Sequence, residues 1–241
     1  MNRVHPQLVA LQTALRPSTT GGPVPDALAN DVYALIRGIK RKARFAEMHM
    51  AMLAGIEWGE VDDIGRRPTG ATGPAHLTIQ LSEATLHIEH PGAVIDHVYR
   101  AFDGLIAALV NMTDTLGRLV NLGYGLGINQ RQATLFAIRK QCTPTSPLGL
   151  ALSDPQNIDW LERVRDLRGR CQHADVEDIL TSTTAPLARR EQPYVEQVYS
   201  WQSPAQSTPL VDYAHDAVQA ADGCLDAAIA AILTNPAGPM R

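Results

Sequence analysis

The sequence predicts an all-α protein, a bundle of helices, and two observations carry this prediction. Ala and Leu are abundant, whereas only 5% of the residues are aromatic. Ala and Leu favour helices, and strands favour aromatic and β-branched residues. In addition, apolar residues recur at spacings of three and four over long segments, most strongly from residue 93 to residue 122. The 241 residues are enough to bury a sizeable core.

The predicted elements follow the chain in order. Apolar spacing predicts helices over residues 4–16, 26–58, 93–122, 129–141, 159–175 and 210–233. Residues 76–89 alternate in a way that suits a small β-hairpin, with a helix as the alternative. Three prolines make residues 142–157 an expected loop. Residues 179–209 are rich in Thr, Ser and Pro, so we expect an irregular segment there with a short strand near Tyr194.

These elements suggest an organisation in three parts. Residues 1–90 form an N-terminal helical segment that packs on the bundle or extends it. Residues 91–235 form the main domain, and residues 236–241 form a tail. A hairpin or an irregular insertion accompanies the helices. No internal repeat and no clear linker divides the chain into two cores.

Bulk properties exclude several classes of protein. The net charge of -4 lacks the basic excess of many duplex nucleic-acid-binding proteins, although a local basic patch stays open. The three cysteines are far apart and form no Cys-x-x-Cys pair, which argues against a disulfide framework or a zinc knuckle. We find no apolar leader and no apolar run of about 20 residues. We therefore expect a cytoplasmic protein that does not enter the membrane.

A basic cluster lies inside the second predicted helix. It runs from Arg37 to Arg44 and contains five Lys or Arg residues. Two interpretations stay open for it, a solvated helix face and a patch that contacts phosphate groups.

The segment from Asp159 to Asp175 concentrates the most chemistry. Asp159 suits the N-cap, and Glu162 three residues later resembles a capping box. Leu161, Val164, Leu167, Cys171 and Ala174 fall on one apolar face. Arg165, Arg168 and Gln172 gather on another side, with His173 at its edge. Gly169 is a weak helix former that could kink the backbone.

Arginine and histidine together suit one kind of reaction. Arginine binds a phosphodiester through its planar fork, and histidine moves a proton near neutral pH. The pair suits cleavage of RNA through its own 2′-hydroxyl, without a metal ion. One helix supplies one such pair, so a second copy of the chain would supply the other. The alternative is a solvated arginine face with an incidental histidine.

The segment Arg168-Gly-Arg-Cys-Gln-His173 resembles the Arg-x(4–6)-His signature of the HEPN superfamily. The predicted long helix, with Phe102-Asp103-Gly-Leu105 and the run from Thr113 to Asn121, resembles the long helix of those proteins. The resemblance extends from about residue 93 to residue 233. It implies a helical bundle that dimerises and a metal-independent endoribonuclease whose composite site lies at the homodimer interface. It also implies a toxin or defence component, with an antitoxin or nucleotidyltransferase partner.

The resemblance also implies roles for particular residues. Arg168 would bind the phosphate and His173 would transfer the proton, while Asp114 would orient Arg168. Arg165, Arg170 and Gln172 would support them. The expected partner is single-stranded or structured RNA, and we expect no cofactor and no metal ion.

Gly169 stands where the family usually has a polar residue. This departure favours an alternative, a non-catalytic HEPN-like interaction or regulatory protein. A helical scaffold unrelated to HEPN is the third option.

Overall fold

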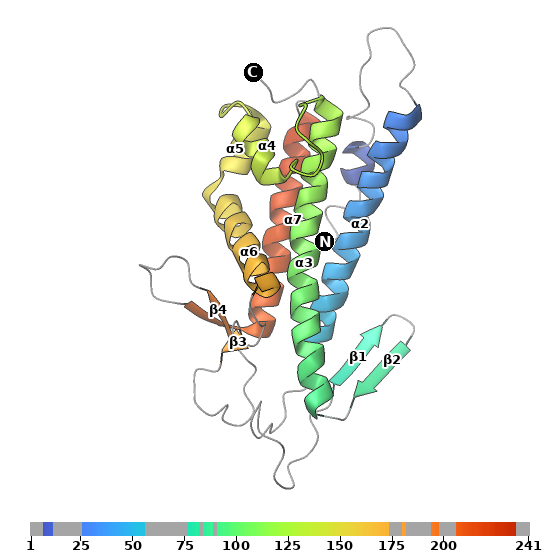
Figure 1. Cartoon of the computed structure of the whole chain (residues 1–241), viewed down its shortest axis with the longest axis vertical. Helices are drawn as coiled ribbons and strands as arrows, with labels where there is room; N and C mark the ends of the chain where they lie inside the picture. The colour runs from blue at the N-terminus through green and yellow to red at the C-terminus, as the bar shows by residue number, and fades with distance from the viewer. Residues whose placement is uncertain are drawn as a thin grey trace. The chain divides into compact units, whose positions relative to one another are not determined.

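The computed structural model describes residues 7–11, 26–55, 77–81, 84–88, 91–173, 180–181, 194–197 and 206–234. Most of these residues are helical, which confirms the all-α fold class. Residues 7–11 are helical, and the labelled helices are α2 (Asp26–Ala54), α3 (Pro91–Tyr124), α4 (Leu135–Gln141), α5 (Pro147–Ser153), α6 (Pro155–His173) and α7 (Leu210–Thr234) (Figure 1).

The strands are short and form two small antiparallel sheets. Strands β1 (Leu77–Leu81) and β2 (Ala84–Ile88) pair with Leu77 opposite Ile88, so this segment is a hairpin and not a helix. Strands β3 (Leu180–Thr181), β4 (Tyr194–Gln197) and β5 (Gln206–Pro209) pair in that order. The short strand expected near Tyr194 is confirmed. The sequence did not predict its two neighbours.

The chain divides into two compact units. The first unit comprises residues 1–44, 108–164 and 218–241, and the second unit comprises residues 45–107 and 165–217. Helices α2, α3, α6 and α7 each contribute residues to both units. The predicted division at residue 90 stays a prediction.

The first unit has a core of aliphatic side chains and closely approaching helices. Its fully buried residues include Leu11, Ile39, Leu109, Met112, Leu116, Leu225 and Ile229. A Cβ added to Gly38 of α2 would lie 3.4 Å from the Cγ2 of Thr115 on α3, so these helices pack closely. The buried Asn121 amide donates to the Ile128 carbonyl at 2.7 Å and accepts from the Ile128 N–H at 3.1 Å. These two bonds close the turn after α3.

Two predicted helix starts and one predicted loop were wrong, and the residues at the helix starts explain each of them. The helix expected from residue 129 begins at Leu135, where the Thr134 hydroxyl accepts from the Ala137 N–H at 3.1 Å. The expected loop over residues 142–157 contains α5, because Pro147 stands in the first turn, where proline is compatible with a helix. Helix α6 begins at Pro155 and not at Asp159.

Asp154, rather than Asp159, caps α6. Its Oδ1 accepts from the Gln156 N–H at 3.0 Å. Asp159 instead forms an ion pair with Arg163 at 3.3 Å, one turn further along the helix. The predicted capping box is therefore wrong, and the Glu162 carboxylate lies 3.8 Å from the Arg139 guanidinium.

The second unit has its own buried residues. They include Leu53 of α2, Leu105 and Ile106 of α3, Leu167 of α6 and Leu210 of α7. Phe102 is fully buried, and its ring centroid lies 6.0 Å from that of Tyr213 at an interplanar angle of 56°.

Helix α7 is long and apolar enough to cross a membrane by length and composition alone. Half of its most apolar window is buried inside the protein, as in the core helix of a soluble protein, so this is weak evidence for a membrane span.

Two glycine substitutions test the packing of the first unit. A Cβ on Gly117 would lie 2.4 Å from the carbonyl carbon of Thr134, whereas a Cβ on Gly223 meets no atom within 4 Å. We expect Gly117→Ala to lower the free energy of unfolding by about 1–3 kcal/mol through overpacking. We expect Gly223→Ala, the matched control, to raise it by about 0.5–1 kcal/mol through helix propensity. Urea unfolding measures both, and an unchanged midpoint for Gly117→Ala would contradict the close packing.

Candidate functional site

Arg168 is anchored to the surface of α3. The apolar face of α6 is buried at Leu161, Val164 and Leu167, as its spacing predicted. Cys171, expected on the same face, is half-buried, and Ala174 lies outside the described residues. Arg168 follows this face and is half-buried. Its Nη1 donates to the carbonyl oxygen of Ala107 at 3.2 Å. A guanidinium has five N–H donors, so this bond leaves most of them for another acceptor.

A histidine from α2 reaches a neighbouring position on α3. A Cβ added to Gly104 would lie 2.4 Å from Cε1, 2.5 Å from Nε2 and 2.9 Å from Nδ1 of His49. The imidazole therefore occupies the space that any larger residue at position 104 would fill. Gly104 and Ala107 are three residues apart and are neighbours on one helix face, roughly 4.5 Å apart along the axis. His49 and Arg168 thus meet the same turn of α3 from two different helices.

Asp103 supplies the negative charge of this cluster. It is exposed, precedes Gly104, and interacts electrostatically with both His49 and Cys171. Asp103 and Ala107 are one turn apart on α3, so the carboxylate belongs to the face that accepts Arg168. The sequence predicted that a different carboxylate, that of Asp114, orients Arg168. Asp114 is half-buried and belongs to the first unit, and its orientation of Arg168 stays a prediction.

Burial favours the neutral form of His49. Burial lowers the pKa of His49 below its ordinary value of 6.5, and the nearby Asp103 carboxylate opposes that shift. Its Nδ1 is buried without a hydrogen-bond partner. A neutral imidazole can accept a proton, and a lowered pKa leaves it unprotonated at pH 7.

Cys171 is not an activated nucleophile. Burial raises the pKa of its thiol to about 11, and Asp103 adds to this rise, while Arg170 and Arg168 act against it. The thiol is therefore protonated at pH 7, and only the thiolate attacks as a nucleophile. The cluster thus combines a cation, a neutral imidazole, a carboxylate and a thiol. This set suits anion binding and proton transfer.

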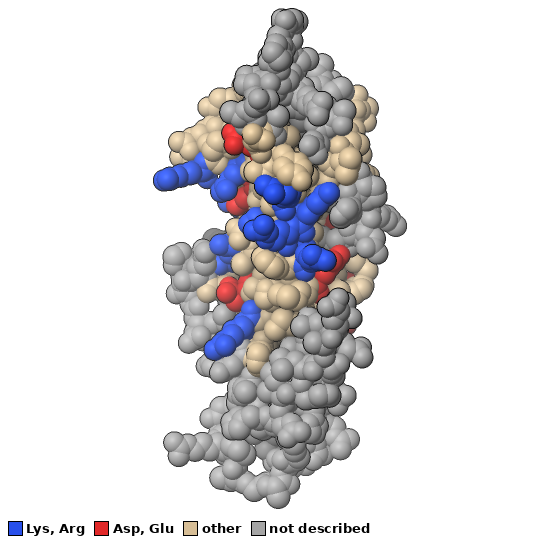
Figure 2. All heavy atoms as spheres, turned by 90° about the vertical axis from the view of Figure 1, so that its right-hand side faces the viewer, with Lys and Arg blue, Asp and Glu red and all other residues tan. Residues whose placement is uncertain are grey.

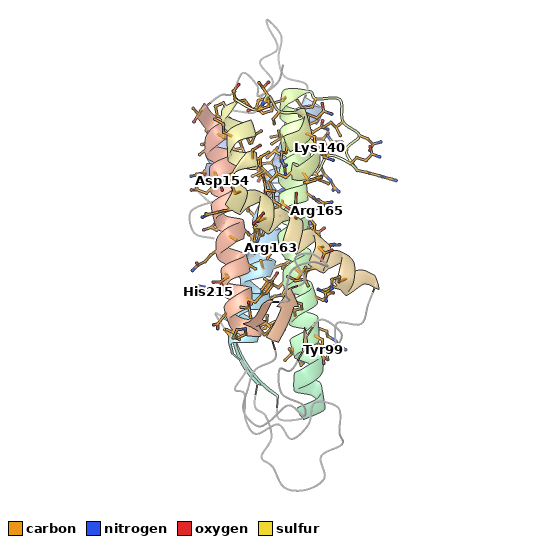
Figure 3. All side chains as sticks on the ribbon, turned by 90° about the vertical axis from the view of Figure 1, so that its left-hand side faces the viewer. Tyr99, Lys140, Asp154, Arg163, Arg165 and His215 are labelled. Atoms are coloured by element: carbon orange, nitrogen blue, oxygen red, sulfur yellow. The ribbon has the colours of Figure 1, made fainter. Side chains whose placement is uncertain are left out.

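Arg165, Arg170, Gln172 and His173, the other residues that the sequence predicted around Arg168, all lie on α6. Arg165 and Arg170 are half-buried, and each has an interaction of its own (Arg165 is labelled on α6 in Figure 3). Gln172 and His173 are the last two residues of α6, but their side chains lie outside the described part of the structure. Gly169 does not end α6, which continues to His173, and a Cβ there would meet open space.

Two further expectations concern metal ions and a second copy. Within the described ranges, no group of three or more His, Cys, Asp or Glu residues could hold a metal ion. The composite site at a homodimer interface stays a prediction.

His49 could not be found from spacing within one helix, because its contact with Gly104 joins distant parts of the chain. The available signal was Gly104 itself, a poor helix former inside a strongly apolar helical pattern.

The pKa of His49 can be measured by NMR titration, with His49→Gln assigning its resonance. We expect a midpoint below 6.5, and a further decrease in Asp103→Asn because the carboxylate raises this pKa. The unfolded chain then binds the proton more readily than the folded chain. The free energy of unfolding should therefore fall as the pH decreases through about 6.5 toward the folded-state value. A midpoint at or above 6.5 would show that His49 is not desolvated.

No protein-family model, no curated protein and no solved structure matches the chain. The all-α fold class rests on the helices themselves, and the HEPN resemblance rests on the segment from Arg168 to His173 and on the long helix α3.

Proposed function

We propose that this protein is a metal-independent endoribonuclease of HEPN type that acts as a homodimer. The observation that supports it best is the anchored guanidinium of Arg168, 3.2 Å from the Ala107 carbonyl, on the turn of α3 that His49 also contacts. Arginine recognises a phosphodiester through charge-assisted hydrogen bonds in a fixed geometry. A guanidinium fixed in advance also loses less conformational entropy when it binds.

The proposed reaction uses the RNA as its own nucleophile. A base removes the proton of the 2′-hydroxyl, the 2′-oxygen bonds to phosphorus, and the bond from phosphorus to the 5′-oxygen breaks. The leaving 5′-oxygen receives a proton, so the products are a 2′,3′-cyclic phosphate and a 5′-hydroxyl. Arg168 stabilises the charge on the phosphate oxygens during this exchange.

Two histidines are candidates for the proton transfers. The HEPN resemblance assigns this role to His173, with the second copy of the chain supplying the other half of the site. His49 is a candidate within one chain, because it is neutral at pH 7 and contacts α3 beside Arg168. The resemblance also supports a toxin or defence role and an antitoxin or nucleotidyltransferase partner.

A non-catalytic interaction protein is the second candidate. The bond from Arg168 to a helix carbonyl favours it, since a bond of this kind ties α6 to α3 whether or not RNA is present. Gly169, in place of the polar residue usual in the family, favours it too. In that case Arg168→Ala would lower the free energy of unfolding, and there would be no cleavage activity for it to lower.

A cleavage assay in the presence of EDTA separates the two candidates. We expect the wild type to cut RNA with the metal chelated, and RNA with 2′-deoxy or 2′-O-methyl sugars to stay intact. Arg168→Ala should lower the rate by roughly 100-fold or more, as loss of a transition-state donor does. Arg168→Lys should restore little, because lysine lacks the fork. Arg131→Ala, at an exposed position, is the matched control and should cut like the wild type.

His173→Ala and His49→Gln identify the histidine. The one that transfers the proton should show a rate loss of about 100-fold or more. If the wild type leaves RNA uncut, the catalytic proposal fails and the interaction protein stands. If the wild type cuts RNA but both histidine variants cut at the same rate, the proposed catalytic roles of His173 and His49 fail.

A further inference from the structure

Helix α2 carries a basic face that the candidate site does not use. Arg37, Lys40, Arg41 and Arg44 follow one another at spacings of i, i+3, i+4 and i+7, so they share one side of the helix. The buried residues Val32, Ile36 and Ile39 lie on the other side and fix its orientation. Figure 2 shows Lys and Arg side chains gathered on the face that α2 presents. Arg37, Arg41 and Arg44 are exposed, and Lys40 is half-buried.

Within the described residues, no ion pair with a carboxylate neutralises the four cations of this face. The segment from Tyr33 to Arg44 contains no Asp or Glu. Like charges three or four residues apart destabilise a helix. An acidic protein, with a net charge of -4, therefore concentrates unpaired positive charge on one helix at a cost in helix stability. An anionic ligand would offset that cost.

An aromatic ring accompanies the cations. Tyr33 is 46% exposed, and the guanidinium carbon of Arg37 lies 4.6 Å from the centre of its ring. Tyr33 precedes Arg37 by one helical turn, so the ring lies at the end of the same row. Surfaces that bind single-stranded nucleic acid combine cations, which follow the phosphates, with aromatic rings, on which bases stack. A duplex keeps its bases stacked on one another and offers none to Tyr33.

We propose that this basic face, formed by Tyr33, Arg37, Lys40, Arg41 and Arg44, binds the backbone of single-stranded RNA. The four cations contact phosphate groups along roughly 10.5 Å of helix axis from Arg37 to Arg44. Tyr33 stacks on one base. The choice of RNA over DNA rests on the proposed function, whereas the binding itself requires no cleavage.

Binding is measured by the fluorescence anisotropy of a labelled 2′-O-methyl RNA strand, which has no free 2′-hydroxyl, over a range of salt concentrations. The full chain is compared with the triple variant Arg37→Gln/Arg41→Gln/Arg44→Gln. The matched control is Arg100→Gln/Arg131→Gln/Lys140→Gln, which removes three exposed cations elsewhere. Each phosphate contact on a single strand contributes about 0.7 to the slope of log K against log salt concentration. The triple variant should therefore lose about 2 from the slope, and the control should keep it.

A separate variant tests the proposed stacking of a base on Tyr33. Tyr33→Ala should weaken binding by about fivefold or more without changing the salt slope, because stacking is not a phosphate contact. Circular dichroism and urea unfolding check that each variant is folded.

Several outcomes would overturn the proposal. They are a wild type that does not bind the strand at low salt, an unchanged slope in the triple variant, and an equal loss in the control. Tighter binding to duplex RNA, to a poly-glutamate peptide or to anionic vesicles would assign the face to another partner. Failure of the proposed nuclease is distinguishable, since binding by the basic face then persists while RNA stays uncut in the cleavage assay.

Discussion

Close approach to α3 is the constraint on which both units depend. Glycine in a helix costs about 1 kcal/mol relative to alanine, so a glycine inside a long helix requires a compensating contact. In the first unit Gly117 admits the backbone at the start of α4, with the carbonyl carbon of Thr134 only 2.4 Å from the site of a Cβ. In the second unit Gly104 admits the ring of His49. In each unit the missing Cβ creates the space that a neighbour fills.

The chemistry of the second unit follows from that packing. Because the His49 ring lies against Gly104, its Nδ1 is shielded from water and its pKa is lowered. Asp103 partly opposes this shift, and Arg168 brings a permanent positive charge to the same turn. The same turn of α3 therefore meets a permanent cation and an imidazole whose neutral form is favoured, a pair that suits anion binding and proton transfer.

The sequence predicted the elements whose signal is local and missed those that depend on tertiary contacts. The apolar repeat located α2, α3 and α7 to within a few residues, and the Arg168 motif was found on α6. Helix α5 was missed because Pro147 was interpreted as a breaker, although proline at a helix start costs nothing. The sequence from Leu77 to Ile88 was compatible with both a β-hairpin and a helix, because alternation of apolar and polar residues over so few positions does not distinguish the two structures. The sequence indicated Asp103 only as part of the segment from Phe102 to Leu105. Its interactions with His49 of α2 and Cys171 of α6 depend on the tertiary fold.

The burial of the cysteines has a consequence for resistance to oxidation. Burial raises the pKa of the Cys142 and Cys171 thiols to about 11 and that of Cys224 to about 12. At pH 7 about one thiol in ten thousand is then ionised at Cys142 and Cys171, and fewer still at Cys224. Peroxides attack the thiolate form. The first step of the oxidation ladder, formation of a sulfenic acid, is therefore slow at all three positions. Burial of the thiols within the fold therefore slows their oxidation.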